Sequence, residues 1–284
     1  MNPKIFCLVL NYRHFLDTEK CISNLMKSDA PIGTKYLIID NSPDNLSVNY
    51  FRKVLPKIKI IRNAGNFGFA KGNNVGIRYA MKQDASHVLI INPDVTVGRR
   101  FFKPLLSGLN TDKKTVIVAP AIRHQQKGET FFGLSGKVDW KTGKASHLNV
   151  RRLSKNKSVT KAEFVTFACA LIKTEVFRKV GLLDERYFMY LEDVDYCLSA
   201  RRAGFKILLD SGVVVDHLTS SSFRKPTDKL LISFRSQIAF INKWLKFPNN
   251  IFPIVYTLFF YPYLYLLWTY HFYKVRLFSY LRKR

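Results

Sequence analysis

The chain has 284 residues, of which 47% are hydrophobic, so it can bury a substantial core and is not an intrinsically disordered protein. It carries 46 Lys and Arg against 20 Asp and Glu, which gives a formal net charge of +26. This charge suits three kinds of partner: nucleic acid, an anionic membrane surface or a phosphorylated substrate. The four cysteines form no CxxC pair, which favours buried free thiols in a reducing compartment.

Apolar runs alternate with amphipathic helical patterns in the first part of the chain. We expect strands at residues 4–10, 35–40, 57–63, 86–92 and 116–120, and helices at 14–27, 70–81 and 99–109. This alternation predicts an α/β fold in which helices cover both faces of a mostly parallel central sheet. Right-handed crossovers place the carboxyl ends of parallel strands at one edge of the sheet, where open α/β folds bind ligands.

The pattern breaks down between about residues 123 and 161, where Gly, Ser, Lys and Asn dominate and where we expect a loop or hairpin excursion. Regular patterns return after this segment. The sequence predicts strands at 164–172, 206–210 and 212–217, and helices at 175–180, 193–203 and 229–245. The last of these helices is basic and amphipathic.

The C-terminal part differs in composition. Residues 251–270 contain no charged side chain and are long enough to span a bilayer, and five Lys and Arg residues follow at 274–284. Aromatic residues and prolines in the segment favour the membrane interface. Three arrangements therefore stay open: an in-plane or re-entrant helix, a true span, and a buried pair of soluble helices. We expect a catalytic domain at 1–222 and a membrane-associating helical extension at 223–284.

A segment rich in Gly and Asn, RNAGNFGFAKGNNVGIRYAM at 62–81, joins an expected strand to an expected helix. Glycine lets the backbone approach a ligand closely, and a helix N-terminus offers unpaired N–H groups to an anion. The segment lacks the Gly-Lys-Ser/Thr of a Walker loop and the spacing of the dinucleotide fingerprint. It is either a ligand-binding turn or a turn-rich connection whose glycines serve packing.

Polar side chains end several of the expected strands. Asp40 can accept hydrogen bonds from a base or a ribose hydroxyl, or it can form an Asx turn or a helix N-cap. Asp94 follows Asn92-Pro93 at another strand end, where an oxygen ligand suits a hard divalent cation. His217, at the end of GVVVDH, is the candidate for a second ligand, and its alternative is a hydrogen-bonded strand residue.

Three acids, Glu192, Asp193 and Asp195, occupy four positions directly after the apolar run FMYL. Acids in the first turn of a helix stabilise its dipole, which explains one of them without a functional site. Three are harder to explain in this way in a chain with few acids. Because an apolar wall can raise the pKa of a carboxylate towards the range of a general base, the cluster predicts proton transfer or metal binding.

These segments, in this order, resemble an inverting family 2 glycosyltransferase with the GT-A fold. The resemblance runs from Lys4 to about Thr219 and rests on LNYR, IIDNS, RNAGNFGFAKGNNVGI, INPDV, FACALIKTEVFRKVGLLDERYFMYLEDVDYCLSARRAGFKI and VVVDHLTSSS. The ordered set is specific, although no single piece is. The subgroup that it looks most like contains bacterial rhamnosyltransferases that build surface polysaccharides.

The resemblance implies how the donor is bound. The base and ribose would be held by Asn11, Tyr12 and Asp40, and the nucleotide-sugar pocket would be lined by Asn63, Gly65, Asn66 and Lys71. Asn92 and Asp94 match the DxD-type motif, with Asn92 in place of its first acid. Asp94 and His217 would bind Mg²⁺ or Mn²⁺ on the diphosphate.

The resemblance also implies how the acceptor reacts. Asp193 matches the aspartate of the ED motif, the general base that removes a proton from the acceptor hydroxyl. Glu192 and Tyr190, with Phe188 and Leu191, are candidates for the acceptor side of the site. Cys169 and Ala170 are expected to leave room beside the sugar.

The function implied is transfer of rhamnose or another hexose from a nucleoside diphosphate to a lipid-linked or polysaccharide acceptor, with inversion. No signal peptide precedes the strand at Lys4, so we expect the enzyme on the cytoplasmic face of a bacterial membrane, bound to an anionic surface and not to nucleic acid. The alternatives are a nucleotidyltransferase that makes a sugar nucleotide and a non-catalytic protein that binds glycan or nucleic acid.

Overall fold

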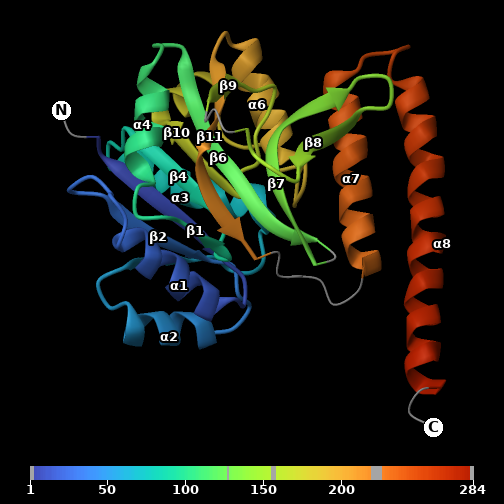
Figure 1. Ribbon diagram of the computed structural model, residues 1–284, viewed down its shortest axis with the longest axis horizontal. Coiled ribbons are helices and arrows are strands. Elements are labelled where there is room, and N and C mark those ends of the chain that lie inside the picture. Colours follow the sequence, from blue (N-terminus) through green and yellow to red (C-terminus); the bar gives the residue numbers. More distant parts are fainter. Residues whose placement is uncertain (1–2, 127, 155–157, 219–225, 282–284) are drawn as a thin grey trace.

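A mixed β-sheet forms the centre of the protein, and helices cover both of its faces (Figure 1). The computed structural model describes residues 3–126, 128–154, 158–218 and 226–281. The strands are β1 Ile5–Asn11, β2 Lys35–Asp40, β3 Lys59–Arg62, β4 His87–Ile91, β5 Val95–Thr96, β6 Thr115–Gln126, β7 Glu129–Asp139, β8 Lys144–Val150, β9 Val159–Lys161, β10 Cys169–Lys173 and β11 Lys206–His217. The helices are α1 Phe15–Met26, α2 Leu46–Val54, α3 Gly68–Lys82, α4 Phe102–Asn110, α5 Thr174–Val180, α6 Glu192–Arg202, α7 Pro226–Trp244 and α8 Ile251–Leu281.

The strand order of the sheet is β3-β2-β1-β4-β10-β6-β11-β5. Strands β3, β2, β1 and β4 run parallel, as the alternation of strands and helices predicted. The register pairs Asn11 with Asp40, so the carboxyl ends of β1 and β2 lie side by side. Strand β10 is antiparallel to both of its neighbours, which brings Ala168, just before its first residue, to the same edge as the end of β4.

Alternate residues of β1 belong to two different cores, because successive side chains of a strand point to opposite faces of the sheet. Ile5, Cys7 and Val9 pack with helices α1, α2 and α4. Phe6 and Leu8 pack on the other face with α3, α5 and α6. The sheet is therefore covered on both sides, and its edge remains available for a site. All four cysteines are buried and free, as predicted.

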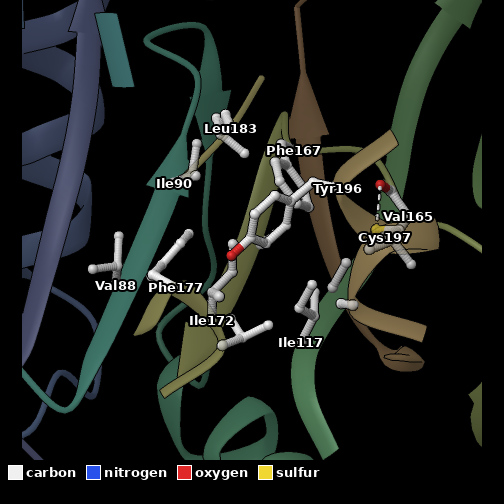
Figure 2. Packing of buried hydrophobic residues seen from close by; sticks show 14 of the residues in the cluster. Val88, Ile90, Ile117, Val165, Phe167, Ile172, Phe177, Leu183, Tyr196 and Cys197 are labelled. Atoms are coloured by element: carbon white, nitrogen blue, oxygen red, sulfur yellow. Dashed lines mark hydrogen bonds between the residues drawn. The ribbon is translucent and has the colours of Figure 1, made fainter. Parts of the chain in front are cut away.

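Helix α6 is fixed in the second core by its own side chains. Figure 2 shows the Tyr196 ring between Phe167 and Phe177, and Cys197 beside Val165. The ring centroids of Tyr196 and Phe177 are 5.4 Å apart, and the Tyr196 hydroxyl donates to the Gly181 carbonyl over 3.0 Å. The orientation of α6 therefore follows from packing, and this orientation sets where its first turn points.

Three expectations about secondary structure were incomplete or wrong. The two strands expected at 206–210 and 212–217 are one strand, β11, whose register against β6 shifts between Asp210 and Val214. The strand expected at 164–172 is regular only from Cys169 onward. Helix α2 and the short strand β5 were not predicted, although Val48 and Phe51 of α2 are buried.

The excursion expected at 123–161 is a hairpin, formed by β7 and β8, that extends towards α7 and α8 (Figure 1). Trp140 at its tip stacks on Phe240 of α7, with ring centroids 6.2 Å apart, and Gln237 donates to the Gly143 carbonyl over 2.7 Å. Helix α8 lies beside α7 at the edge of the molecule. The domain boundary expected at residues 222 and 223 lies outside the described residues.

Candidate active site

A cavity of about 820 Å³ opens at the edge of the sheet where β1, β2 and β4 end. Its wall combines segments that are far apart in the sequence. Of the residues predicted for the site, it contains Tyr12, Asn66, Asn92, Asp94, Tyr190, Glu192, Asp193 and His217. The two acidic motifs and the imidazole therefore line one cavity, and the roles expected of them stay predictions.

Asp94 and His217 form a close pair in this wall. Strand β5, directly after Asp94, pairs antiparallel with the end of β11, and the Leu218 amide donates to the Asp94 carbonyl over 3.0 Å. As a result, Nε2 of His217 lies 3.1 Å from Oδ1 of Asp94. Asp216 points to the other face and binds Arg123, with Nη2 2.8 Å from Oδ2, as strand alternation predicted.

Asp94 and His217 could supply two of the ligands of a divalent cation. Among the described residues, no group of three or more His, Cys, Asp and Glu side chains could hold a metal ion. A carboxylate and an imidazole still suit Mg²⁺ or Mn²⁺ when phosphate oxygens and water complete the coordination. Asn92 also lines the cavity, and its backbone amide donates to the Ala168 carbonyl over 2.8 Å. Asn92 thus occupies the predicted position without adding a carboxylate.

Asp193 lies in the first turn of α6 and also lines the cavity. Its Oδ2 accepts a hydrogen bond of 3.2 Å from the Phe167 amide, and its Oδ1 lies 2.8 Å from the Val194 amide. The residues before it have an unusual backbone, because Tyr190 and Leu191 both have positive φ, 72° and 68°. Non-glycine residues with such φ values are strained and concentrate at functional sites. The strained backbone at Tyr190 and Leu191 therefore directly precedes the acidic turn that lines the cavity.

Glu192 differs from Asp193 in its surroundings. Only 6% of its surface is exposed, and its Oε2 accepts no hydrogen bond from the described residues. Burial, together with the neighbouring Asp193 charge, holds the pKa of Glu192 well above its usual range. Burial also raises the pKa of Tyr190 to about 12. Glu192 and Tyr190 therefore hold their protons more tightly than usual, beside the Asp193 carboxyl in the cavity wall.

Several predicted donor residues lie behind the cavity wall. Asn11 and Asp40 are buried, and Nδ2 of Asn11 donates to Oδ1 of Asp40 over 2.7 Å. Thr18 donates to Asn11 over 3.0 Å, so the Asn11 side chain is held in place. Oδ2 of Asp40 is buried and accepts no hydrogen bond from the part of the chain described. This unpaired oxygen is suited to a donor group on an incoming ligand, and contact of Asn11 and Asp40 with the nucleotide stays a prediction.

The Gly- and Asn-rich segment serves both packing and the site. Asn63 is buried and donates to Asn41 over 2.7 Å, whereas Asn66 lines the cavity. Gly65 and Lys71 do not belong to the cavity wall, and Nζ of Lys71 lies 4.4 Å from the centroid of the Phe67 ring. Their predicted contacts with the donor remain predictions.

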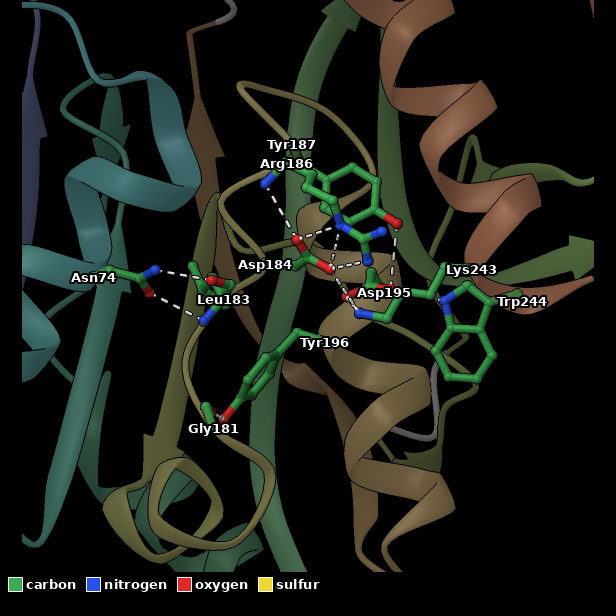
Figure 3. Close-up of polar contacts among 10 residues, drawn as sticks. All are labelled: Asn74, Gly181, Leu183, Asp184, Arg186, Tyr187, Asp195, Tyr196, Lys243 and Trp244. Carbon is green, nitrogen blue, oxygen red and sulfur yellow. Dashed lines mark hydrogen bonds and ion pairs between the residues drawn. The ribbon is translucent and has the colours of Figure 1, made fainter.

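Within the same segment, Asn74 is structural. Figure 3 shows it in two hydrogen bonds with the backbone of Leu183, one of 2.8 Å to the carbonyl and one of 3.0 Å from the amide. Helix α3 therefore holds the chain that leads to the acidic turn.

Two expectations for the acceptor side are corrected. Cys169 and Ala170 leave no room beside a sugar, because they are fully buried in the two opposite cores of the sheet. The preceding residue Ala168 lines the cavity instead. Phe188 lies outside the cavity wall, whereas Tyr190 and Leu191 form part of it.

Other lining residues were not singled out from the sequence. They are His14, Asn41, His147, Thr166, Lys229 and Trp268. Asn41 could have been predicted as a site residue, because it directly follows Asp40 at a strand end. His147, Lys229 and Trp268 come from β8, α7 and α8, and they reach the cavity through tertiary packing that no local pattern records.

Comparison with known proteins identifies what this arrangement is similar to. The family model "Glycosyltransferase like family 2" matches residues 3–231. The low-salt glycan biosynthesis hexosyltransferase Agl10 of Haloferax volcanii is 26% identical over 257 residues, covering 86% of this chain and 75% of that protein. The N-acetylglucosaminyl-diphospho-decaprenol L-rhamnosyltransferase of Mycobacterium tuberculosis is 23% identical over 261 residues, covering 81% and 82%.

A solved structure, of GalNAc-T7 with UDP, GalNAc and Mn²⁺, superimposes with a TM-score of 0.64 at 16% identity. The alignment covers 78% of this chain and 45% of that one. This likeness supports the GT-A fold. The family match supports neither a nucleotidyltransferase nor a non-catalytic binding protein.

Proposed function

Because the chain belongs to the family 2 glycosyltransferases and is an enzyme that transfers sugar from a nucleotide-sugar donor, we propose that the cavity holds donor and acceptor together. The observation that carries this proposal is that Asp94, His217 and Asp193 line one cavity. The first two suit the diphosphate side of a donor, and the third suits a hydroxyl that attacks from the other side. A single displacement between them inverts the anomeric carbon.

The proposed mechanism assigns the proton to Asp193. As the acceptor hydroxyl attacks the anomeric carbon, Asp193 takes its proton, so the oxygen that forms the new bond ends neutral and the carboxyl of Asp193 ends protonated. Its Oδ2 is oriented by the Phe167 amide, which leaves the carboxylate one preferred direction. Glu192 and Tyr190 hold their protons more tightly than usual, and in their protonated forms they are proposed to donate hydrogen bonds to sugar hydroxyls.

The leaving nucleoside diphosphate gains negative charge in the same step. We propose that Asp94 and His217 hold Mg²⁺ or Mn²⁺ there, and the ion would neutralise part of that charge. The Mn²⁺ in the solved GalNAc-T7 structure is consistent with this assignment. Tyr12, Asn66 and Asn92 line the cavity and are proposed to contact the nucleotide sugar, with Asn11 and Asp40 behind Tyr12.

We propose rhamnose or another hexose as the transferred sugar and a lipid-linked or polysaccharide acceptor, in line with the names of the relatives. Trp268 of α8 lies in the cavity wall. Since α8 is also the helix suited to a membrane, an acceptor anchored in lipid would reach the site along this helix. The proposed location is the cytoplasmic face of a cell membrane.

Helix α8 is the proposed membrane contact. Within the described residues, one helical segment, Ile251–Tyr270, has the length and composition to cross a membrane. Its exposed residues are Ile251, Phe252, Val255, Leu258, Phe259, Pro262, Tyr263, Tyr265, Leu266 and Tyr270. At 3.6 residues per turn they occupy one sector of about 160°. One continuous apolar face therefore points away from the protein.

The opposite face of α8 favours an in-plane helix over a span. Phe234 of α7 packs on Tyr261, with ring centroids 5.5 Å apart, and Nζ of Lys144 lies 4.1 Å from the centroid of Phe260. Both contacts fall at the middle of the segment. A span would carry Lys144 and the exposed Arg235 of α7 to the centre of the bilayer, at a cost of about 3 kcal/mol or more for each charge. An in-plane helix leaves both charges in water.

The function is tested with a panel of UDP-, dTDP- and GDP-sugars and Mn²⁺. Selective thermal stabilisation by one class identifies the donor, because a ligand that binds the folded state raises its stability. Transfer and donor hydrolysis are then measured for the wild type and for Asp193→Asn. We expect Asp193→Asn to lose at least about 100-fold in turnover while it keeps nucleotide affinity. Full turnover by Asp193→Asn would reject Asp193 as the base.

A further inference from the structure

Helix α7 contacts the loop that carries the acidic turn at three places. Nζ of Lys229 lies 5.5 Å from the centroid of the Tyr190 ring. The Ser236 hydroxyl donates to the Met189 carbonyl over 2.8 Å. At the end of the helix, Nε1 of Trp244 donates to Oδ1 of Asp195 over 2.7 Å. Helix α7 therefore contacts residues on both sides of Leu191: Met189 and Tyr190 before it, and Asp195 after it.

The contact at the end of α7 is a partly buried ionic cluster centred on Asp195 (Figure 3). Nζ of Lys243 lies 2.7 Å from Oδ2 of Asp195 and 2.9 Å from Oδ2 of Asp184. The Tyr187 hydroxyl donates to the remaining oxygen of Asp195 over 3.3 Å, and Asp195 is only 2% exposed. Because removal of charges from water is costly, apolar side chains of similar size would stabilise the fold to about the same extent. What the cluster adds is a defined geometry.

That geometry is needed next to a strained backbone. Tyr190 and Leu191 have φ of 72° and 68°, and residues in such conformations persist only when their surroundings hold them there. Asp195 follows Asp193 by two residues in the first turn of α6, and its amide donates to the Leu191 carbonyl over 2.9 Å. A group that fixes Asp195 therefore fixes the strained turn and the direction of Asp193.

We propose that Lys243 and Trp244 are positioning residues for the proposed base: they hold Asp195, and through it they fix the first turn of α6 so that Asp193 faces the acceptor hydroxyl. The inference rests on the proposed role of Asp193 and adds a second element, α7, to the site. Neither Lys243 nor Trp244 touches the cavity that holds Asp193. Because small misplacements of reacting groups slow chemistry strongly, their loss should lower turnover rather than donor binding.

The test compares Lys243→Met and Trp244→Phe with Arg235→Met. Arg235 is an exposed cation on the same helix, so its replacement makes the same change in charge without touching Asp195. Calorimetric titration with the nucleoside diphosphate counts the folded sites and gives Kd. We expect kcat per site to fall by about 10- to 100-fold in the two cluster variants, while Kd and the donor KM stay within about twofold. Arg235→Met should match the wild type.

Two results would overturn the inference. One is an unchanged kcat per nucleotide-binding site in both Lys243→Met and Trp244→Phe. The other is a loss of nucleotide affinity that parallels the loss of kcat, because this would indicate general damage to the fold. Failure of the wild type to transfer any sugar would instead overturn the proposed function, and the inference with it. Trp244→Phe keeps an aromatic ring in place and guards against a Lys243 variant that does not fold.

Discussion

Asp94 and His217 stand only 3.1 Å apart, with Asp216 next to His217 but directed to the opposite face. Because of this arrangement, Asp94→Asn can be compared with Asp216→Asn, which changes a neighbouring carboxylate outside the cavity. If Asp94 and His217 hold a divalent cation on the donor, Mn²⁺ should strengthen binding of the nucleoside diphosphate to the wild type. We expect Asp94→Asn to lose that gain by at least about tenfold in Kd, measured by calorimetry with and without Mn²⁺.

Asp216→Asn is the control for this experiment. It removes a carboxylate one residue from His217, but its partner is Arg123 and not the cavity. We expect it to keep the full gain in affinity from Mn²⁺. An Asp94→Asn variant that responds to Mn²⁺ as the wild type does would reject the metal assignment.

Glu192 predicts a pH dependence of stability. Burial raises its pKa in the folded protein above the value of about 4.3 expected in the unfolded chain. Between these two values the folded protein keeps a proton that the unfolded chain has lost, so the free energy of unfolding decreases as pH rises through this range. Glu192→Gln removes this effect. It should therefore be increasingly stable relative to the wild type as pH rises from about 4 towards neutrality.

Urea unfolding of both proteins across this pH range measures the difference. Glu175→Gln serves as the control, because Glu175 is exposed on α5 and should give a difference that does not change in this way with pH. A Glu192→Gln variant whose relative stability is the same at both ends of the range would show that Glu192 is ionised in the folded protein.

Among the secondary-structure elements, Gly68 at the start of α3 joins the two loops of the site. It has φ of +71°, and a Cβ there would come within 2.2 Å of the Phe188 carbonyl oxygen. The next amide, of Phe69, donates to the same oxygen over 2.6 Å. We expect Gly68→Ala to lower the free energy of unfolding by about 2 kcal/mol or more, as measured by urea unfolding.

Gly65 provides the comparison within the same loop. It has no positive φ, and a Cβ there would meet no atom within 4 Å. Gly65→Ala should therefore change the stability by no more than about 0.5 kcal/mol. Equal effects of the two substitutions would contradict the close approach of Gly68 to Phe188.

The strands and helices of the first half were predictable because their hydrophobic patterns are periodic and because a buried parallel sheet leaves continuous apolar runs. The strand ends then indicated Asp40, Asn92 and Asp94. Helix α2 was missed because a short amphipathic segment depends on Val48 and Phe51 finding a core. Two strands were predicted at 206–210 and 212–217, whereas the chain continues as one strand with a shift in register between Asp210 and Val214.

Other parts of the site could not be predicted from local patterns. His147, Lys229 and Trp268 line the cavity because β8, α7 and α8 fold back over the sheet edge. Asp195 looked like part of an acidic site, but Lys243 and Trp244 bind it from a helix almost 50 residues later in the chain. Such long-range contacts carry no periodic signal in the sequence.

For the whole molecule, the in-plane placement of α8 would connect the membrane to the active site. The apolar face of Ile251–Tyr270 would lie in the lipid, while its other face contacts α7, which in turn holds Asp195. Trp268 at the cavity wall would mark where a lipid-anchored acceptor enters. The net charge of +26 would add attraction to an anionic surface.

Binding to anionic vesicles tests the membrane face. Leu266 and Leu46 are equally exposed, at 67% and 68%, but Leu46 lies on α2. We expect Leu266→Asp to weaken vesicle binding by at least about tenfold and Leu46→Asp to leave it unchanged, as measured by co-sedimentation. If the two variants bind vesicles equally well, the membrane contact is not made by α8.

Depth measurements separate an in-plane helix from a span. Single cysteines can be introduced at Val255, Phe259 and Tyr270, all of which are exposed, and spin-labelled without interference because the four native cysteines are buried. An in-plane helix places all three labels at one shallow depth, about 5–10 Å below the headgroups. A span of Ile251–Tyr270 places the label at 259 about 2 Å from the bilayer centre and the label at 255 about 8 Å from it, whereas the label at 270 lies about 14 Å away, near one surface. The second profile would exclude the in-plane placement, and it would require Lys144 and Arg235 either to separate from α8 or to enter the hydrocarbon.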